Sequence, residues 1–77
     1  MECNFFSYHW TQVNGKEILQ QGDCYYFTTL TNYDLQEMKD YAKRFFSIDP
    51  AAIITIQNIQ PITKELFELK TGKPFFL

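Results

Sequence analysis

The sequence has 77 residues, of which 45% are hydrophobic and 18% aromatic, and its net charge at pH 7 is −2. This length predicts a single domain over residues 1–77, near the lower limit for a chain that folds without disulfides or a metal. The acidic balance argues against a general electrostatic attraction to nucleic acid or anionic membranes, and no run of about 18 apolar residues is present to cross a bilayer.

Residues 5–13 predict the first strand, because they combine aromatic and β-branched residues without glycine or proline. The side chains of a strand alternate between its two faces. One face then carries Phe6, Tyr8 and Trp10, and the other carries Phe5, Ser7, His9, Thr11 and Val13. Since both faces are largely apolar, we expect this strand to lie in the middle of a sheet.

The second strand is predicted over residues 24–30, which are again aromatic and β-branched. Asn14-Gly15 is a dipeptide favoured in two-residue hairpin turns, but a turn there would leave residues 26–30 without a partner. A wider connection over residues 14–22, or a bulge near Gly22, lets the whole second strand pair with the first. We favour these wider arrangements over the tight turn.

A helix is predicted to start at Thr31, whose hydroxyl caps it, with the acid Asp34 three residues on. Apolar residues at helical spacing then form one stripe. The stripe consists of Leu35, Met38, Ala42, Phe45 and Phe46. We expect the helix to end before Pro50, because the residue that precedes a proline avoids the helical region.

Residues 51–59 predict the third strand, because four isoleucines in seven residues favour a strand over a helix, and Pro61 is expected to close it. Thr63 then caps a short helix over residues 64–70. Its expected buried contacts are Leu66, Phe67 and Leu69. Gly72 ends this helix, and residues 73–77 follow as an extended apolar tail.

These elements predict an α+β fold with the topology β-β-α-β followed by a short C-terminal helix. The simplest arrangement is a three-stranded antiparallel sheet in the order 2-1-3, with the main helix across one face. Ala52, Ile54 and Ile56 of the third strand are expected to pack against the apolar stripe of that helix.

The sequence predicts no enzyme. His9 and Cys24 are the only pair that resembles a base and a nucleophile, and neither an orienting third group nor an oxyanion pocket accompanies them. One histidine and two isolated cysteines do not form a spaced set of metal ligands, so we expect no catalytic, cofactor-binding or metal-binding residue. The two cysteines are expected to be free thiols, and residues 1–4 do not resemble a secretory signal, which together indicate a cytoplasmic protein.

The fourteen aromatic residues exceed what one small core encloses, so part of them is expected to bind a protein partner. The candidate partner-binding residues are Phe6, Tyr8, Trp10 and Tyr26 on the sheet and Phe75 and Phe76 in the tail. The alternative is a nucleic-acid-binding module in which the same aromatic face stacks on bases, but the sequence offers no basic groove beside it. Because one helix covers only one face of the sheet, we also expect a homodimer held through the sheet face or the tail.

The pattern of elements resembles small phage- or prophage-encoded proteins of uncharacterised function. The resemblance rests on the hairpin from Phe5 to Leu30, the capped helix that includes Asp34-Leu35-Gln36-Glu37, and the strand from Ile53 to Ile59. It covers about three quarters of the chain, contains no diagnostic motif and does not extend to the segment from Thr63 onward. Such proteins act by binding, as host-defence inhibitors (anti-CRISPR proteins among them) or as small regulators, and the resemblance implies this mode of action here.

Overall fold

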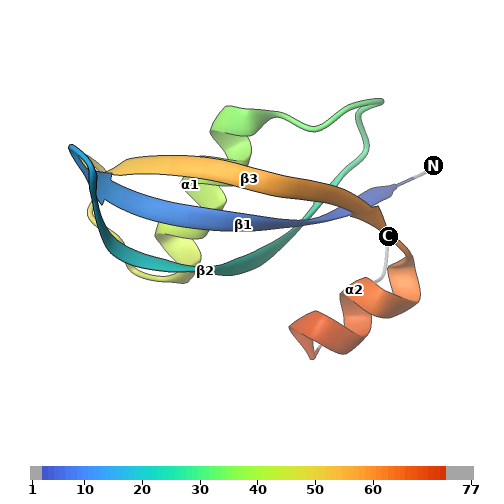
Figure 1. Ribbon diagram of the computed structural model, residues 1–77. Helices are drawn as coiled ribbons and strands as arrows, with labels where there is room; N and C mark the ends of the chain where they lie inside the picture. The colour runs from blue at the N-terminus through green and yellow to red at the C-terminus, as the bar shows by residue number, and fades with distance from the viewer. Residues whose placement is uncertain (1–2, 73–77) are drawn as a thin grey trace.

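The structure is a computed structural model that describes residues 3–72. Its elements in chain order are β1 (Asn4–Asn14), β2 (Glu17–Thr28), α1 (Leu35–Phe45), β3 (Ile53–Ile62) and α2 (Lys64–Thr71). The strands form one antiparallel sheet in the order β2-β1-β3, with α1 behind it in the view of Figure 1. The predicted α+β fold, its topology and the central position of the first strand are confirmed.

The hairpin between β1 and β2 is tighter than predicted. Its turn lies at Gly15-Lys16, where Gly15 has a φ of 64°, a conformation that costs glycine little. Gln12 pairs with Gln20 and Val13 pairs with Ile18, so Leu19 is an extra, bulged residue. The expected wide connection over residues 14–22 is therefore wrong, because one bulge at Leu19 brings the long strands into full pairing while the turn stays tight.

The core lies between α1 and the face of the sheet that carries Tyr8 and Trp10. Trp10 is only 1% exposed, and Met38 and Ala42 of α1 are fully buried against the sheet. The buried cluster comprises Tyr8, Trp10, Cys24, Tyr26, Met38, Ala42, Ile48 and Ile54, with Ala52 and Ile56 packed at its margin. The expected packing of the third strand on Met38 and Ala42 is confirmed.

Only the middle of α1 packs into this core, whereas the sequence predicted a longer buried stripe. Leu35 and Phe45 are exposed, Phe45 to 69%. The helix crosses the strands rather than running along them (Figure 1). Its 11 residues span about 16 Å, whereas three strands span only about 10 Å, so its two ends extend beyond the sheet.

The start of α1 also differs from the prediction. The N-cap is Asp34 and not Thr31, because the Asp34 carboxylate accepts hydrogen bonds from the backbone N–H groups of Gln36 and Glu37 at 2.9 and 3.2 Å. The helix ends at Phe45, before Pro50, as predicted.

β3 continues through Pro61, which was expected to end the strand. Pro61 pairs with Phe6 of β1, and β3 has no strand on its other side within residues 3–72. A proline is tolerated there because its missing N–H falls on the outer edge of an edge strand. The predicted cap of the second helix is confirmed, since the Thr63 hydroxyl accepts a hydrogen bond from the Leu66 N–H at 3.1 Å.

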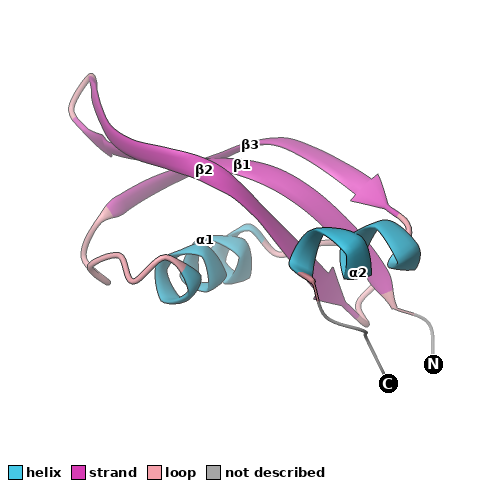
Figure 2. Ribbon diagram, turned by 90° about the horizontal axis from the view of Figure 1, so that it is seen from below, coloured by secondary structure: helices cyan, strands magenta, loops and turns pink. Residues whose placement is uncertain are grey.

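α2 packs on the face of the sheet opposite α1, some way along the strands from it (Figure 2). Phe67 is buried there, with its ring 4.9 Å from that of Phe5 and 5.9 Å from that of Phe27, measured between ring centroids. Leu69 was expected to be buried but is 75% exposed, because a helix of 8 residues contacts the sheet along one side only. Gly72 ends the helix in the left-handed conformation, with a φ of 73°.

Candidate functional site

Most of the residues predicted to bind a partner belong to the core. Tyr8, Trp10 and Tyr26 are buried and Phe6 is packed against them, all beneath α1. Tyr8 and Trp10 are therefore inaccessible both to a protein and to stacked bases in this conformation, whereas Phe6 is only partly buried and Tyr26 lines a hollow beside α1. Phe75 and Phe76, the other two predicted residues, lie outside the described residues 3–72.

The pair His9 and Cys24 is separated by the sheet itself. Cys24 belongs to the core on the α1 side, and His9 lies on the opposite face. Burial raises the pKa of the Cys24 thiol, which disfavours the reactive thiolate. Both cysteines are free, as predicted.

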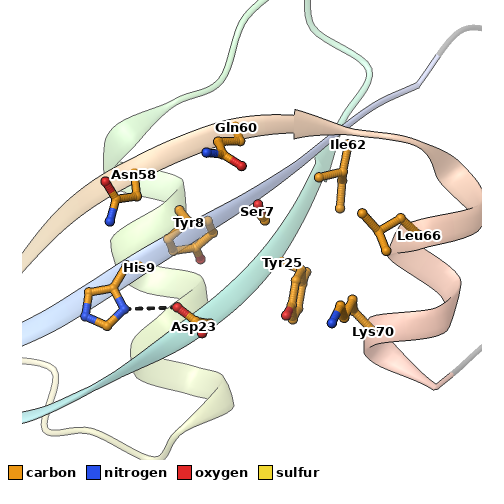
Figure 3. Close-up of a pocket in the computed structure, with 10 residues that line it drawn as sticks. All are labelled: Ser7, Tyr8, His9, Asp23, Tyr25, Asn58, Gln60, Ile62, Leu66 and Lys70. Atoms are coloured by element: carbon orange, nitrogen blue, oxygen red, sulfur yellow. Dashed lines mark hydrogen bonds and ion pairs between the residues drawn. The ribbon is translucent and has the colours of Figure 1, made fainter.

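His9 instead belongs to a polar groove between the sheet and α2, which sequence reasoning missed (Figure 3). Its Nδ1 lies 3.0 Å from Oδ1 of Asp23 and its Nε2 lies 3.1 Å from Oε1 of Gln21. The bond to Asp23, followed by the bond to Gln21, raises the pKa of His9. The groove has a volume of about 370 Å³, and Tyr25 and Lys70 line its α2 end.

This groove does not have the geometry of a catalytic triad. Ser7 and His9 lie two residues apart on β1, and both ring nitrogens of His9 already bond to Asp23 and Gln21. No nitrogen is left to accept the proton of a Ser7 hydroxyl, as a general base must. Within residues 3–72, no three His, Cys, Asp or Glu side chains come together as a metal ion requires.

A second candidate site lies along the outer edge of β2. Among the described residues, β2 pairs with β1 alone. In an antiparallel edge strand, alternate residues direct their N–H and C=O groups away from the sheet, where another strand can bond to them. β2 has no proline along its 12 residues, whereas the other edge strand, β3, carries Pro61 and an irregularity at Asn58, which has a φ of 56°.

The C-terminal half of α1 forms a wall beside this edge. Tyr41 stacks on Phe45, with 6.4 Å between ring centroids and 15° between ring planes, and Arg44 lies 5.8 Å from the centre of the Tyr41 ring. Three adjoining hollows of about 290, 240 and 120 Å³ all include Tyr41. The wall therefore presents aromatic surface next to a strand edge with which no other strand of the described part pairs.

α2 supplies the opposite wall. The hollow of about 120 Å³ lies at Asp23, Cys24 and Tyr25, between Tyr41 and Phe45 of α1 and Lys70 and Thr71 of α2. We call the whole feature the edge slot. It consists of residues 23–27 of β2, Glu37, Asp40, Tyr41, Arg44 and Phe45 of α1, and Lys70 and Thr71 of α2.

The charges along the edge slot are unevenly distributed: two carboxylates and Arg44 share the hollow at the Tyr26 end, and Asp23 shares the other end with Lys70. Glu37 and Asp40 lie at the end beside Tyr26, where the Tyr26 hydroxyl donates to Glu37. Lys70 lies at the other end, beside Tyr25. Within the part of the chain that the structure describes, neither Arg44 nor Lys70 has a carboxylate within ion-pair distance.

The edge slot was missed because its parts come from three elements, β2, α1 and α2, that are far apart in the sequence. Tyr41 falls off the predicted apolar stripe, and Phe45 was placed in the core with that stripe. The sequence contains more aromatic residues than one small core can enclose. This excess correctly indicated that some aromatic surface is exposed, but it did not indicate where.

No protein family, curated protein or solved structure matches this chain. No helix within residues 3–72 is long and apolar enough to span a membrane.

Proposed function

We propose that the chain is a small, non-enzymatic interaction module that binds an extended segment of a protein partner as a fourth strand on the outer edge of β2. The observation that carries this proposal is the edge slot, in which the β2 edge that pairs with no other strand among residues 3–72 lies between the aromatic wall of Tyr41 and Phe45 and the wall formed by α2. Strand addition of this kind takes its affinity from main-chain hydrogen bonds and its specificity from side-chain contacts.

The energetics of such a complex are adequate for a reversible interaction. An aromatic side chain buried against Tyr41 and Phe45 removes up to about 150–250 Å² from water, an upper bound of roughly 4–6 kcal/mol. A few main-chain hydrogen bonds add about 0.5–1.5 kcal/mol each. After the cost of ordering the segment, these terms suit dissociation constants in the micromolar range.

A protein segment fits the edge slot better than a nucleic acid. The net charge of the chain is −2, and the slot carries Glu37 and Asp40 as well as Arg44 and Lys70, so it offers no continuous basic track for phosphates. The aromatic residues that the nucleic-acid alternative requires lie under α1.

The proposal is tested with peptides selected from a random heptapeptide library on the immobilised protein. We expect the selected peptides to lose at least about tenfold in affinity for the variant Phe45→Ser. The matched control is Leu69→Ser, which removes an equally exposed apolar residue from α2 outside the slot and should leave affinity unchanged.

Strand addition also predicts a pattern in the peptide. N-methylation of the peptide backbone should abolish binding at alternate positions only, because only every second N–H faces β2. Peptides that bind equally well to Phe45→Ser, or that tolerate N-methylation at every position, would overturn the proposal.

The predicted homodimer remains a prediction, and exposed residues on the sheet face opposite α1 support it. Val13 of β1 pairs with Ile18 on one side and with Ile53 on the other, and both isoleucines are exposed. This row crosses the sheet at the hairpin end, where a second copy can bury it. Sedimentation equilibrium at micromolar concentration should give a dimer mass that Ile53→Ser converts to a monomer mass, whereas a monomeric parent protein would contradict the prediction.

The two free cysteines also support our proposal that the chain acts in the reducing environment of the cytoplasm. Fractionation of the producing cells tests this proposal. The protein should be recovered, with unmodified thiols, in the cytosolic fraction. Recovery in an extracytoplasmic fraction would contradict it.

A further inference from the structure

The walls of the edge slot also favour particular side chains in the segment that it binds. These preferences rest on the proposed strand addition. Side chains of an added strand alternate between the two faces of the sheet in step with those of β2. Cys24 and Tyr26 lie on the α1 side and Tyr25 lies on the α2 side. A partner residue opposite each of them therefore meets a different wall of the slot.

The walls differ in charge and polarity. A residue opposite Tyr26 meets the two carboxylates of Glu37 and Asp40 and the single guanidinium of Arg44, a balance that favours a basic side chain. A residue opposite Tyr25 meets Lys70 and also Asp23, but the Asp23 carboxylate bonds to His9, so the charge of Lys70 favours an acidic side chain.

The position opposite Cys24 is different, because it offers aromatic surface rather than charge. A residue there meets the stacked rings of Tyr41 and Phe45, which favour an aromatic or large apolar side chain. The three positions are adjacent along the partner strand.

The direction of the partner strand decides the order in which these residues occur. Antiparallel pairing is the more stable arrangement per residue and the more common one. A strand antiparallel to β2 passes Tyr26 first, then Tyr25, then Cys24.

We infer that the edge slot recognises an extended protein segment that runs antiparallel to β2 and carries consecutive basic, acidic and aromatic residues in that order. The juxtaposition of Glu37 and Asp40, Lys70, and the Tyr41–Phe45 pair around one open strand edge carries this inference.

Two synthetic peptides of identical composition test the order. One is Ac-Thr-Val-Lys-Glu-Phe-Thr-Val-NH2, and the other is its reversal, Ac-Val-Thr-Phe-Glu-Lys-Val-Thr-NH2. At low salt the first should bind at least about fivefold more tightly than the second, and its addition should shift the backbone amide resonances of residues 23–27. Equal binding of the two peptides, or tighter binding of the reversal, would overturn the inferred order.

A charge-reversal variant tests the pairing with Lys70. Lys70→Glu should lower the affinity for the first peptide by about three- to tenfold at low salt. It should raise the affinity for a version of the first peptide in which lysine replaces glutamate. Lys64→Glu, a change of the same charge at the start of α2, is the matched control and should have no effect. Unchanged affinity of Lys70→Glu for both peptides would contradict the assigned acidic position.

The two proposals fail in distinguishable ways. If neither synthetic peptide binds but library-selected peptides shift the resonances of residues 23–27, the inferred sequence pattern is wrong and strand addition stands. If the selected peptides shift Ser7, His9 and Gln60 of the His9 groove but none of residues 23–27, both proposals are wrong.

Discussion

Ile53 and Ile54 are neighbours on β3 that test which face of the sheet forms the core. Ile54 is 3% exposed and belongs to the core cluster, whereas Ile53 is 64% exposed on the other face. Ile54→Ala removes three buried carbon atoms, worth about 0.8 kcal/mol each, and leaves a cavity under α1. The expected loss in the free energy of unfolding is about 2–5 kcal/mol. Ile53→Ala should cost less than about 1 kcal/mol, mainly through lower strand propensity.

The measurement is urea denaturation followed by the fluorescence of Trp10, the only tryptophan, at a concentration where the protein is monomeric. A domain of this size has a total stability of only about 4–12 kcal/mol, so Ile54→Val, with an expected loss of about 0.5–1.5 kcal/mol, serves as a milder second variant. Equal losses for the two alanine variants, or a larger loss for Ile53→Ala, would refute the assignment of the core face.

Other positions give sharp expectations. A Cβ at Gly22 would lie 3.2 Å from the Trp10 ring, so Gly22→Ala should lower the free energy of unfolding by about 1–3 kcal/mol in urea, and an unchanged value would contradict this packing. The hydrogen bonds of His9 to Asp23 and Gln21 raise its pKa in the folded state above the unfolded-state value of about 6.5. The stability that they add should therefore be fully present below pH about 6.5 and lost as the pH rises through the folded-state pKa. NMR titration of the imidazole checks this, and a pKa at or below about 6.5 would be inconsistent with it. Iodoacetamide should alkylate Cys3 faster than the buried Cys24 in the native protein, as mass spectrometry can show; equal rates would argue against burial of Cys24.

Local signals predicted the elements well where a single residue determined the outcome. Thr63 and Gly72 mark the two ends of α2, and each is the only suitable cap at its position. At the start of α1 the prediction took Thr31 as the cap and Asp34 as the acid three residues on, but the Asp34 carboxylate itself bonds to the first turn.

Non-local features were harder to predict. Pro61 is compatible with a strand only because β3 lies at the edge of the sheet. The residues next to Pro61 in the sequence do not show this position, because it depends on the order of the strands in the sheet. The hairpin register depends on one bulged residue, Leu19, within an otherwise regular strand. No local pattern distinguishes a bulged leucine from a paired one.

The candidate site depends on this register. The alternation of side chains along β1 separated the two faces correctly, but periodicity alone does not show which face a helix covers. Tyr8 and Trp10 were therefore assigned to a binding surface although α1 covers them. The pairing register of β1 and β2 places Cys24 beside Tyr41 and Phe45, at the end of α1 that extends beyond the sheet. The edge slot depends on this placement.

The most direct test of strand addition is a set of nuclear Overhauser contacts between β2 and a bound peptide selected from the library. The account predicts cross-strand Hα–Hα contacts between the peptide and residues 23–27, together with contacts between a peptide aromatic ring and the ring of Tyr41 or Phe45. A bound peptide with contacts to α1 or to the His9 groove, and with no backbone contact to residues 23–27, would contradict it.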